Sequence, residues 1–169
     1  MMEINIRKAI LDDAYNLSYI HAMSWKEAYK GIVPDEYIET KTVEAGFEKL
    51  QKMIINKPDA NYIAELDGKA IGRLTIHECY DKDSPDTGEI GVFYILPEYW
   101  RKGYGKQIAA FALAELKSRG YSSVSLWTLE ASTRARRFYE SVGFELDDAQ
   151  KTLDLGKPLT AVRYRMELI

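Results

Sequence analysis

The stretch that decides the fold is GEIGVFYILPEYWRKGYGKQIAAFA, residues 88–112 of a 169-residue chain. Its pattern predicts a strand over residues 89–96, a break over residues 97–102 that begins with proline, and a helix that starts around residues 103–106. A strand, a turn and a helix in this order form the centre of the predicted fold.

The turn in this stretch has the properties of an anion site. Gly103 and Gly105 bracket a helix start, where backbone N–H groups have no partner within the helix. The positive end of the helix dipole favours an anion there, and Arg101, Lys102 and Lys106 add positive charge. We therefore expect the turn to bind the phosphates of a cofactor.

The composition limits the class of protein. Lys plus Arg is 23 and Asp plus Glu is 26, a net charge of −3, which argues against nucleic-acid binding. Cys79 is the only cysteine, so no intrachain disulfide can form, which fits a reducing compartment. The N-terminus lacks the apolar core of a signal peptide, and no apolar run approaches the ~20 residues of a membrane helix. We expect a cytoplasmic protein with no nucleic-acid or membrane partner.

Outside the central stretch, periodicity and turn residues predict alternating strands and helices. The further strands are expected over residues 3–9, 61–66, 70–80, 122–129, 144 onward and 160–168. The further helices are expected from residue 12 or 13 to 30, and over residues 34–40, 43–56 and 132–142. This order predicts a mixed α/β sheet with helices on both faces, in a single domain of residues 1–169.

Three local signals support these boundaries. Asp67-Gly68 between two apolar runs predicts a hairpin. Asp12 or Asp13 is suited to cap the first long helix, and Thr42 is suited to cap the helix over residues 43–56. The expected inner face of the latter helix consists of Ala45, Phe47, Leu50 and Ile54.

Two common glycine-rich phosphate motifs do not fit the turn. A dinucleotide fingerprint needs a third glycine or alanine where Ile108 stands. A P-loop needs serine or threonine after its lysine, but Gln107 follows Lys106.

Two longer segments resemble the GNAT family of N-acetyltransferases, small bacterial type. YILPEYWRKGYGKQIAAFAL, residues 94–113, is similar to the family's acetyl-CoA-binding segment, with Trp100 where the family usually has Gln or Arg. LWTLEASTRARRFYESVGFE, residues 126–145, is similar to its later strand and helix, with Ser132 where the family has Asn. The resemblance implies the GNAT acyl-CoA N-acyltransferase fold, a twisted and mostly antiparallel sheet of about six or seven strands.

The resemblance also implies how acetyl-CoA is held. In the family the central strand carries a bulge and splays from its neighbour, and pantetheine pairs with the strand backbone in the gap. The matching residues here are Tyr94, Ile95 and Leu96. The pyrophosphate would bind the turn, and Ser132 would lie near the cofactor; the residues of the turn are Arg101, Lys102, Gly103, Tyr104, Gly105 and Lys106.

The same resemblance assigns chemistry to Tyr139 and Glu89. Tyr139 shares an inward helical stripe with Phe138 and would protonate the leaving thiolate, because a phenol with a pKa of roughly 10 is protonated at neutral pH. Glu89, at the start of the central strand, would act as the base directly or through water. His77 is a rival base, since imidazole titrates near neutral pH, and Cys79 is a less favoured nucleophile. No metal-ligand spacing is present.

The implied reaction is direct acetyl transfer in a ternary complex to a primary amine of a small molecule, such as a polyamine or amino acid. Residues 25–37, with Trp25, Tyr29 and Tyr37, are expected to frame the acceptor or to be ordinary helix packing. The alternatives are a non-catalytic acyl-CoA-binding or sensing module and a peptide or protein N-acetyltransferase. Many relatives are dimers, so a homodimer is one of the states open to the chain.

Overall fold

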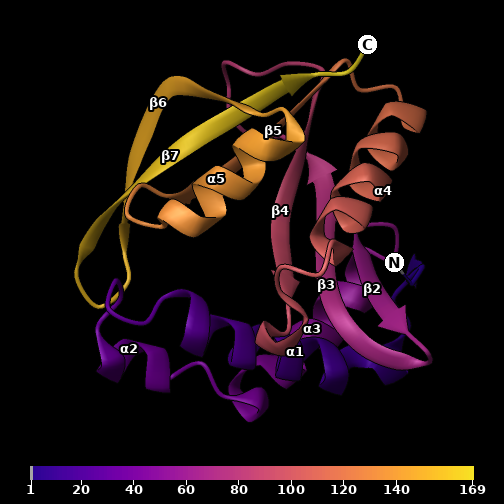
Figure 1. The fold of residues 1–169 in the computed structure, drawn as a ribbon, viewed down its shortest axis with the longest axis vertical. Helices are drawn as coiled ribbons and strands as arrows, with labels where there is room; N and C mark the ends of the chain where they lie inside the picture. Colours follow the sequence, from indigo (N-terminus) through magenta and orange to yellow (C-terminus); the bar gives the residue numbers. More distant parts are fainter. Residues whose placement is uncertain (1) are drawn as a thin grey trace.

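A computed structural model describes residues 2–169 and arranges them around one seven-stranded sheet (Figure 1). The strands are β1 (Asn5–Lys8), β2 (Asn61–Leu66), β3 (Lys69–Glu78), β4 (Thr87–Ile95), β5 (Ser123–Leu129), β6 (Glu145–Asp154) and β7 (Pro158–Glu167). Their spatial order is β1-β2-β3-β4-β5-β7-β6. Within the described residues β4 and β5 form the one parallel pair, so the predicted mostly antiparallel sheet is confirmed.

Helices cover both faces of the sheet, as predicted. They are α1 (Ala14–Ala28), α2 (Asp35–Glu39), α3 (Val43–Asn56), α4 (Tyr104–Ser118) and α5 (Thr133–Val142), with short 3₁₀ turns η1 (Leu11–Asp13) and η2 (Pro97–Tyr99). On one face Ile108 of α4 packs in a buried cluster with Leu74 of β3. On the other face Leu17 of α1 and Ile54 of α3 pack with Ile63 of β2. Because side chains alternate along a strand, neighbouring residues of β2 serve the two faces.

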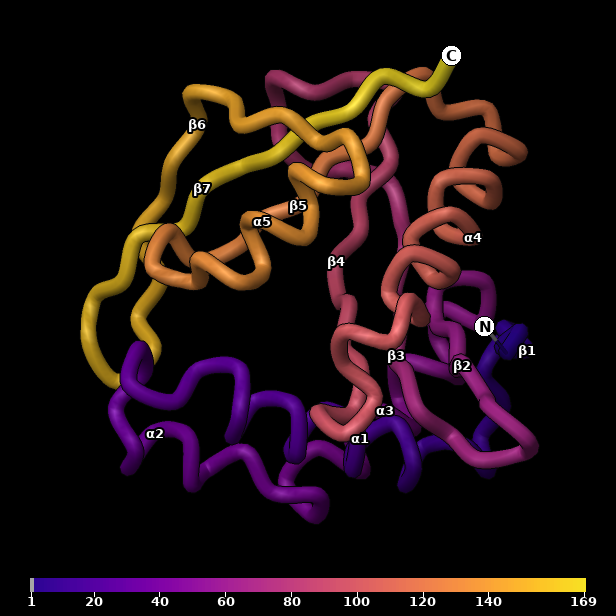
Figure 2. Tube along the Cα trace, viewed as in Figure 1, coloured from indigo at the N-terminus to yellow at the C-terminus, as the bar shows by residue number. Residues whose placement is uncertain are grey.

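Two hairpins fix the ends of the sheet. Asp67 (φ 50°) and Gly68 (φ 77°) both adopt the left-handed conformation of a two-residue turn, which confirms the predicted hairpin between β2 and β3. The long β6–β7 hairpin turns at Gly156 next to α2, where the two segments meet in the trace (Figure 2). A Cβ on Gly156 would lie 2.9 Å from Cβ of Tyr37, so this turn packs directly on α2.

The start of α3 confirms one prediction and corrects another. Thr42 Oγ1 accepts a hydrogen bond from the Ala45 N–H at 3.1 Å, so the predicted cap is confirmed. Ala45, however, is exposed, and its assignment to the inner face is wrong. The contact with α1 is made by Gly46, where a Cβ would lie 2.5 Å from Ser18 Oγ. The helices approach closely at this glycine, which lies where Ala45 was expected, whereas Phe47, Leu50 and Ile54 pack inward as predicted.

The start of α1 also differs from the expectation. Asp13 occupies the N-cap position of α1 but makes no side-chain hydrogen bond to the helix. Its carboxylate accepts hydrogen bonds from Arg7 Nη1 at 2.7 Å and from the Ile10 N–H at 2.8 Å. The predicted cap is therefore an ion pair that ties β1 to η1. In the part of the chain that the structure describes, no helix combines the length and apolar character needed to cross a bilayer.

Candidate active site

Strand β4 leaves its neighbour β5 after three residue pairs. The parallel register covers Thr87, Gly88 and Glu89 opposite Ser123, Val124 and Ser125, and no strand of the described chain pairs with this edge of β4 beyond Glu89. On the other edge, the register with β3 jumps from Thr75–Val92 to Ile76–Ile90, which makes Gly91 an inserted bulge residue. The expected bulge and splay of the central strand are thereby confirmed.

The register decides which backbone groups face the gap. Leu96 donates its N–H to Ile71 O at 2.9 Å and accepts from the Tyr99 N–H, so the prediction that it faces the gap is wrong. Since pairing alternates along an antiparallel ladder, the backbone of Tyr94 also turns toward β3. The N–H groups of Phe93 and Ile95 turn toward the gap. Ile95 remains a predicted backbone contact, while Tyr94 contributes its side chain.

The glycine turn between β4 and α4 has a left-handed backbone that would let a ligand approach the main chain closely. Arg101 has φ 59° and Gly103 has φ 86°, and Gly103 is the N-cap of α4 without a side-chain cap. A Cβ on Gly105 would lie 3.0 Å from the ring of Phe138, which explains why glycine stands there. The backbone N–H groups at the helix start are thus presented without a capping side chain, as an anion site requires.

Trp100 anchors this turn, although the family pattern has a polar residue at its position. Its indole N–H donates to Ile95 O at 2.7 Å, and the same carbonyl accepts from Ser24 Oγ at 3.1 Å. The guanidinium of Arg134, from α5, stacks 3.6 Å from the centre of the Trp100 ring. The stack holds a cation beside the turn, where a phosphate would bind.

A cavity of about 500 Å³ runs from the turn along the splayed edge of β4. Most of the predicted cofactor residues line it: Tyr94, Ile95, Arg101, Gly103, Gly105, Lys106 and Ser132. Lys102 does not, because its ammonium lies over the ring of Tyr99, and Tyr104 is buried in the core. Ser132 is the N-cap residue of α5, and its side chain makes no capping hydrogen bond to the helix.

Tyr139 lines the cavity from α5. Its ring packs edge-on against Phe93 of β4 and Phe144, within the main core cluster. Burial raises the pKa of Tyr139 above its ordinary value, so the hydroxyl stays protonated at neutral pH. Tyr29 and Tyr94, whose hydroxyls lie 3.0 Å apart, line the cavity beside it.

Glu89 does not line the cavity. Its carboxylate lies with Cys79 and Asp81, and their ligand atoms are all within 4.8 Å of one another. Ser125 Oγ donates to Cys79 Sγ at 3.3 Å, and burial raises the pKa of the Cys79 thiol. A thiol kept protonated is a poor nucleophile, so the geometry gives no support to the Cys79 route.

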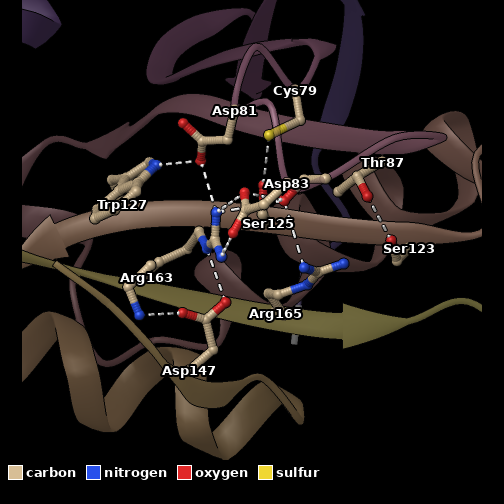
Figure 3. A network of polar contacts seen from close by, with 12 residues as sticks. Cys79, Asp81, Asp83, Thr87, Ser123, Ser125, Trp127, Asp147, Arg163 and Arg165 are labelled. Atoms are coloured by element: carbon tan, nitrogen blue, oxygen red, sulfur yellow. Dashed lines mark hydrogen bonds and ion pairs between the residues drawn. The ribbon is translucent and has the colours of Figure 1, made fainter.

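A polar network continues from this cluster to Trp127 and Arg163 (Figure 3). Arg163 of β7 is buried and donates to Asp81, Asp83 and Asp147 at 3.1, 2.7 and 2.7 Å. Asp81 also accepts from Trp127 Nε1 at 2.9 Å. Because Trp127 lines the cavity, the loop between β3 and β4 fixes one of its walls.

The aromatic residues expected at the acceptor site are mostly elsewhere. Trp25 and Tyr37 belong to a buried cluster and do not line the cavity, whereas Tyr29 does. Lys41 places its ammonium 5.1 Å from the Trp25 ring centre and 4.6 Å from that of Tyr37. The chain's own lysine therefore makes the cation–π contacts that were expected for an acceptor amine.

Sequence reasoning missed the wall formed by β5. Trp127 and Thr128 line the cavity, but residues 122–129 were assigned only as a strand. Val124, Ser125 and Leu126 are all buried, whereas Trp127 is half-buried. Alternation along this strand therefore does not mark Trp127 as a residue of the cavity wall.

Comparisons with known proteins agree with this geometry. Residues 20–144 match the sequence profile described as the Acetyltransferase (GNAT) family. A spermidine N(1)-acetyltransferase of Thermoplasma acidophilum is 30% identical over 87% of this chain and 91% of its own length. An uncharacterised N-acetyltransferase of Archaeoglobus fulgidus is 28% identical over 82% of this chain and 90% of its own. The crystal structure of the PaiA N-acetyltransferase from Thermoplasma acidophilum in complex with coenzyme A superposes with a TM-score of 0.75 at 24% identity, and covers 98% of this chain and 99% of that one.

Proposed function

The chain belongs to the GNAT family of acetyltransferases, so it is an acyltransferase that uses acetyl-CoA, and we propose that it acetylates the primary amine of a small molecule by direct transfer. One observation carries this proposal. A single cavity joins the basic turn at the start of α4, the unpaired edge of β4 and Tyr139 of α5. These would hold pyrophosphate, pantetheine and the thioester, in that order.

Each part of the proposed site has a chemical task. Amide groups around Gly103 and Gly105 bind phosphate oxygens, with Arg101, Lys106 and Arg134 as countercharges. The N–H groups of Phe93 and Ile95 are suited to pair with the amide-rich pantetheine arm, as an added strand would. Tyr139 is the proposed acid. Glu89, the base that the family resemblance implies, lies off the cavity wall and would reach the amine only through an intermediate group, so it is kept as the alternative base in the tests below.

A polyamine is the acceptor that we propose to test first. The similarity to a protein named as a spermidine acetyltransferase extends over most of both chains. We further propose that residues 1–169 are one acetyltransferase domain, since all seven strands belong to one sheet. A cytoplasmic location, where acetyl-CoA is at hand and Cys79 stays reduced, belongs to the same proposal. So does a homodimer, which light scattering can test.

The test is thiol release from acetyl-CoA across a panel of amines. The panel contains spermidine, lysine, an aminoglycoside and a peptide with a free N-terminus, with acetyl-CoA alone as the control for hydrolysis. We expect release with a small amine and recovery of its acetylated product by mass spectrometry. Binding of acetyl-CoA without release on any amine would instead favour the non-catalytic sensing module.

A further inference from the structure

The proposed reaction needs a base near the acetyl end of the cavity. An amine is largely protonated at neutral pH, and it must lose a proton before its lone pair can attack the thioester. Among the described residues that line the cavity, none is a histidine, a cysteine or a carboxylate. The charged side chains of the wall are Arg101, Lys106, Arg134 and Arg137, which are all cationic. The base must therefore reach the wall from the layer behind it.

His77 stands directly behind the wall at the bulge. It lies on β3, across from Glu89, and shares the α1–α3 face of the sheet with Arg73 and Thr75. A Cβ on Gly91 would lie 2.5 Å from Nε2 of His77. Gly91 itself lines the cavity, so the imidazole edge of His77 packs against a residue of the cavity wall. Any larger residue at position 91 would push the ring away.

The hydrogen bonds of His77 leave the correct nitrogen available. Nδ1 lies 2.7 Å from the carbonyl oxygen of Glu78. A carbonyl only accepts, so Nδ1 carries the proton and Nε2 holds the lone pair. The ring of Tyr80 stacks on the imidazole at 5.0 Å and 14°, which fixes its orientation. The ring is only half-buried, so solvent can receive the proton after each turnover.

The second histidine of the chain cannot serve as this base. His21, on α1, lies with Nδ1 2.9 Å from Nη1 of the buried Arg73. Burial, together with the charge of Arg73, lowers the pKa of His21 to about 3. It therefore stays neutral through the range in which amines are acetylated.

We propose that His77 is the catalytic base of the acetyl transfer, with its Nε2 brought to the acceptor amine at the Gly91 bulge. The inference rests on the proposed function and deepens it. Nε2 takes one proton from the ammonium, and the freed lone pair forms the N–C bond to the thioester carbonyl. The C–S bond breaks, and the thiolate takes the proton of Tyr139. The second proton of the nitrogen returns to the tyrosine oxygen, and the proton on His77 passes to solvent.

The test compares His77→Gln with variants of two neighbouring residues, Glu78→Gln and Glu89→Gln. His77→Gln keeps a polar side chain of similar length but cannot accept a proton near neutral pH. We expect kcat to fall about 10²-fold, the acidic limb of the kcat/KM profile to disappear, and acetyl-CoA binding by calorimetry to stay unchanged. Glu78→Gln is the matched control, because only its backbone carbonyl contacts His77 and its side chain is exposed. It should behave as wild type.

Other titratable groups face His77, and their effects on the pH profile must be distinguished from that of His77. They are Glu89 on β4, Tyr80 in the following loop, and Lys57 at the end of α3, which donates to the Tyr80 hydroxyl. Exogenous imidazole should restore activity to His77→Ala but not to Glu89→Ala, which a merely structural role of His77 would not produce.

Two results overturn the assignment in different ways. If His77→Gln keeps the wild-type pH profile and Glu89→Gln loses the acidic limb, Glu89 is the base, either directly or through a water molecule. If the wild-type protein releases no thiol with any amine, the proposed function itself fails, and the assignment fails with it.

Discussion

At the scale of single residues, Tyr139 carries the clearest expectation. Tyr139→Phe removes one oxygen from a ring that is otherwise held by Phe93 and Phe144. We expect kcat to fall about 10²-fold, the low end for loss of a positioned acid. The affinity for acetyl-CoA, measured by calorimetry, should stay within a factor of about two, because the substitution does not change the glycine turn that we propose binds the phosphates.

A second tyrosine provides the control for that experiment. Tyr121 packs against the main core but does not line the cavity. Tyr121→Phe should leave kcat unchanged. Equal losses in both variants would mean that hydroxyl removal acts through stability, and the acid would have to be sought elsewhere.

The sequence could identify single residues where their environment is local. The inward position of Tyr139 follows from helical periodicity and the glycine turn follows from a helix start, while the family resemblance implied the role of Tyr139; both line one cavity. The relation between His77 and Gly91 could not be predicted in this way. It depends on a bulge that shifts the register of β4 against β3, and a strand pattern of period two contains no sign of the shift.

At the scale of elements, the cap of α3 is directly testable. Thr42→Ala removes the oxygen that accepts the Ala45 N–H. The free energy of unfolding should fall by about 1 kcal/mol in urea titration, and Thr42→Ser should retain most of it. An unchanged midpoint for Thr42→Ala would show that water replaces the cap without cost.

The joint between β1 and η1 gives a prediction about pH. Burial alone would raise the pKa of Asp13, but hydrogen bonds from Arg7 and the Ile10 N–H outweigh burial and hold the pKa below its usual value. A carboxyl with a depressed folded pKa contributes its full stability above the unfolded value of about 3.9 and loses it as pH falls through the folded value. Urea unfolding at pH 7 and pH 3 should show a larger loss for wild type than for Asp13→Asn, by about 1 kcal/mol. Parallel losses would contradict the prediction.

Elements defined by local signals were predicted closely, and those defined by packing were not. The bounds of α3 and the β2–β3 hairpin follow from a cap and an Asp-Gly turn. The inner face of α3 and the partner of Asp13 depend on where α1 and β1 lie. Those positions depend on tertiary packing. Because of them, Gly46 rather than Ala45 contacts α1, and Asp13 pairs with Arg7 instead of capping the helix.

At the scale of the whole molecule, the sheet consists of two blocks. β1 to β4 form one antiparallel block and β5 to β7 the other, and three residue pairs of β4 and β5 join them. Arg163 and its three aspartates add a second tie, between the loop before β4 and the β6–β7 hairpin. The sequence predicted the elements of both blocks, but their junction depends on long-range pairing that no local pattern encodes.

Because the two blocks are joined by few residue pairs, we expect binding of acetyl-CoA between them to raise the stability of the folded protein. A ligand that fills the splayed edge binds the folded state only, and at a hundred times its dissociation constant it adds about 2.7 kcal/mol. Saturating acetyl-CoA should therefore raise Tm by several degrees in a thermal-shift assay. Arg134→Met, with its weaker phosphate site, should need a higher concentration for the same shift. Equal curves for both proteins would argue against a phosphate contact at Arg134.

The short join between β4 and β5 also bears on how long the protein survives in a cell. Segments with few cross-strand pairs open more often than the rest of a fold, and proteases cut the open form. A molecule with an empty cavity would be degraded sooner than one that carries its cosubstrate. The amount of enzyme would then follow the supply of acetyl groups, without any separate regulatory domain.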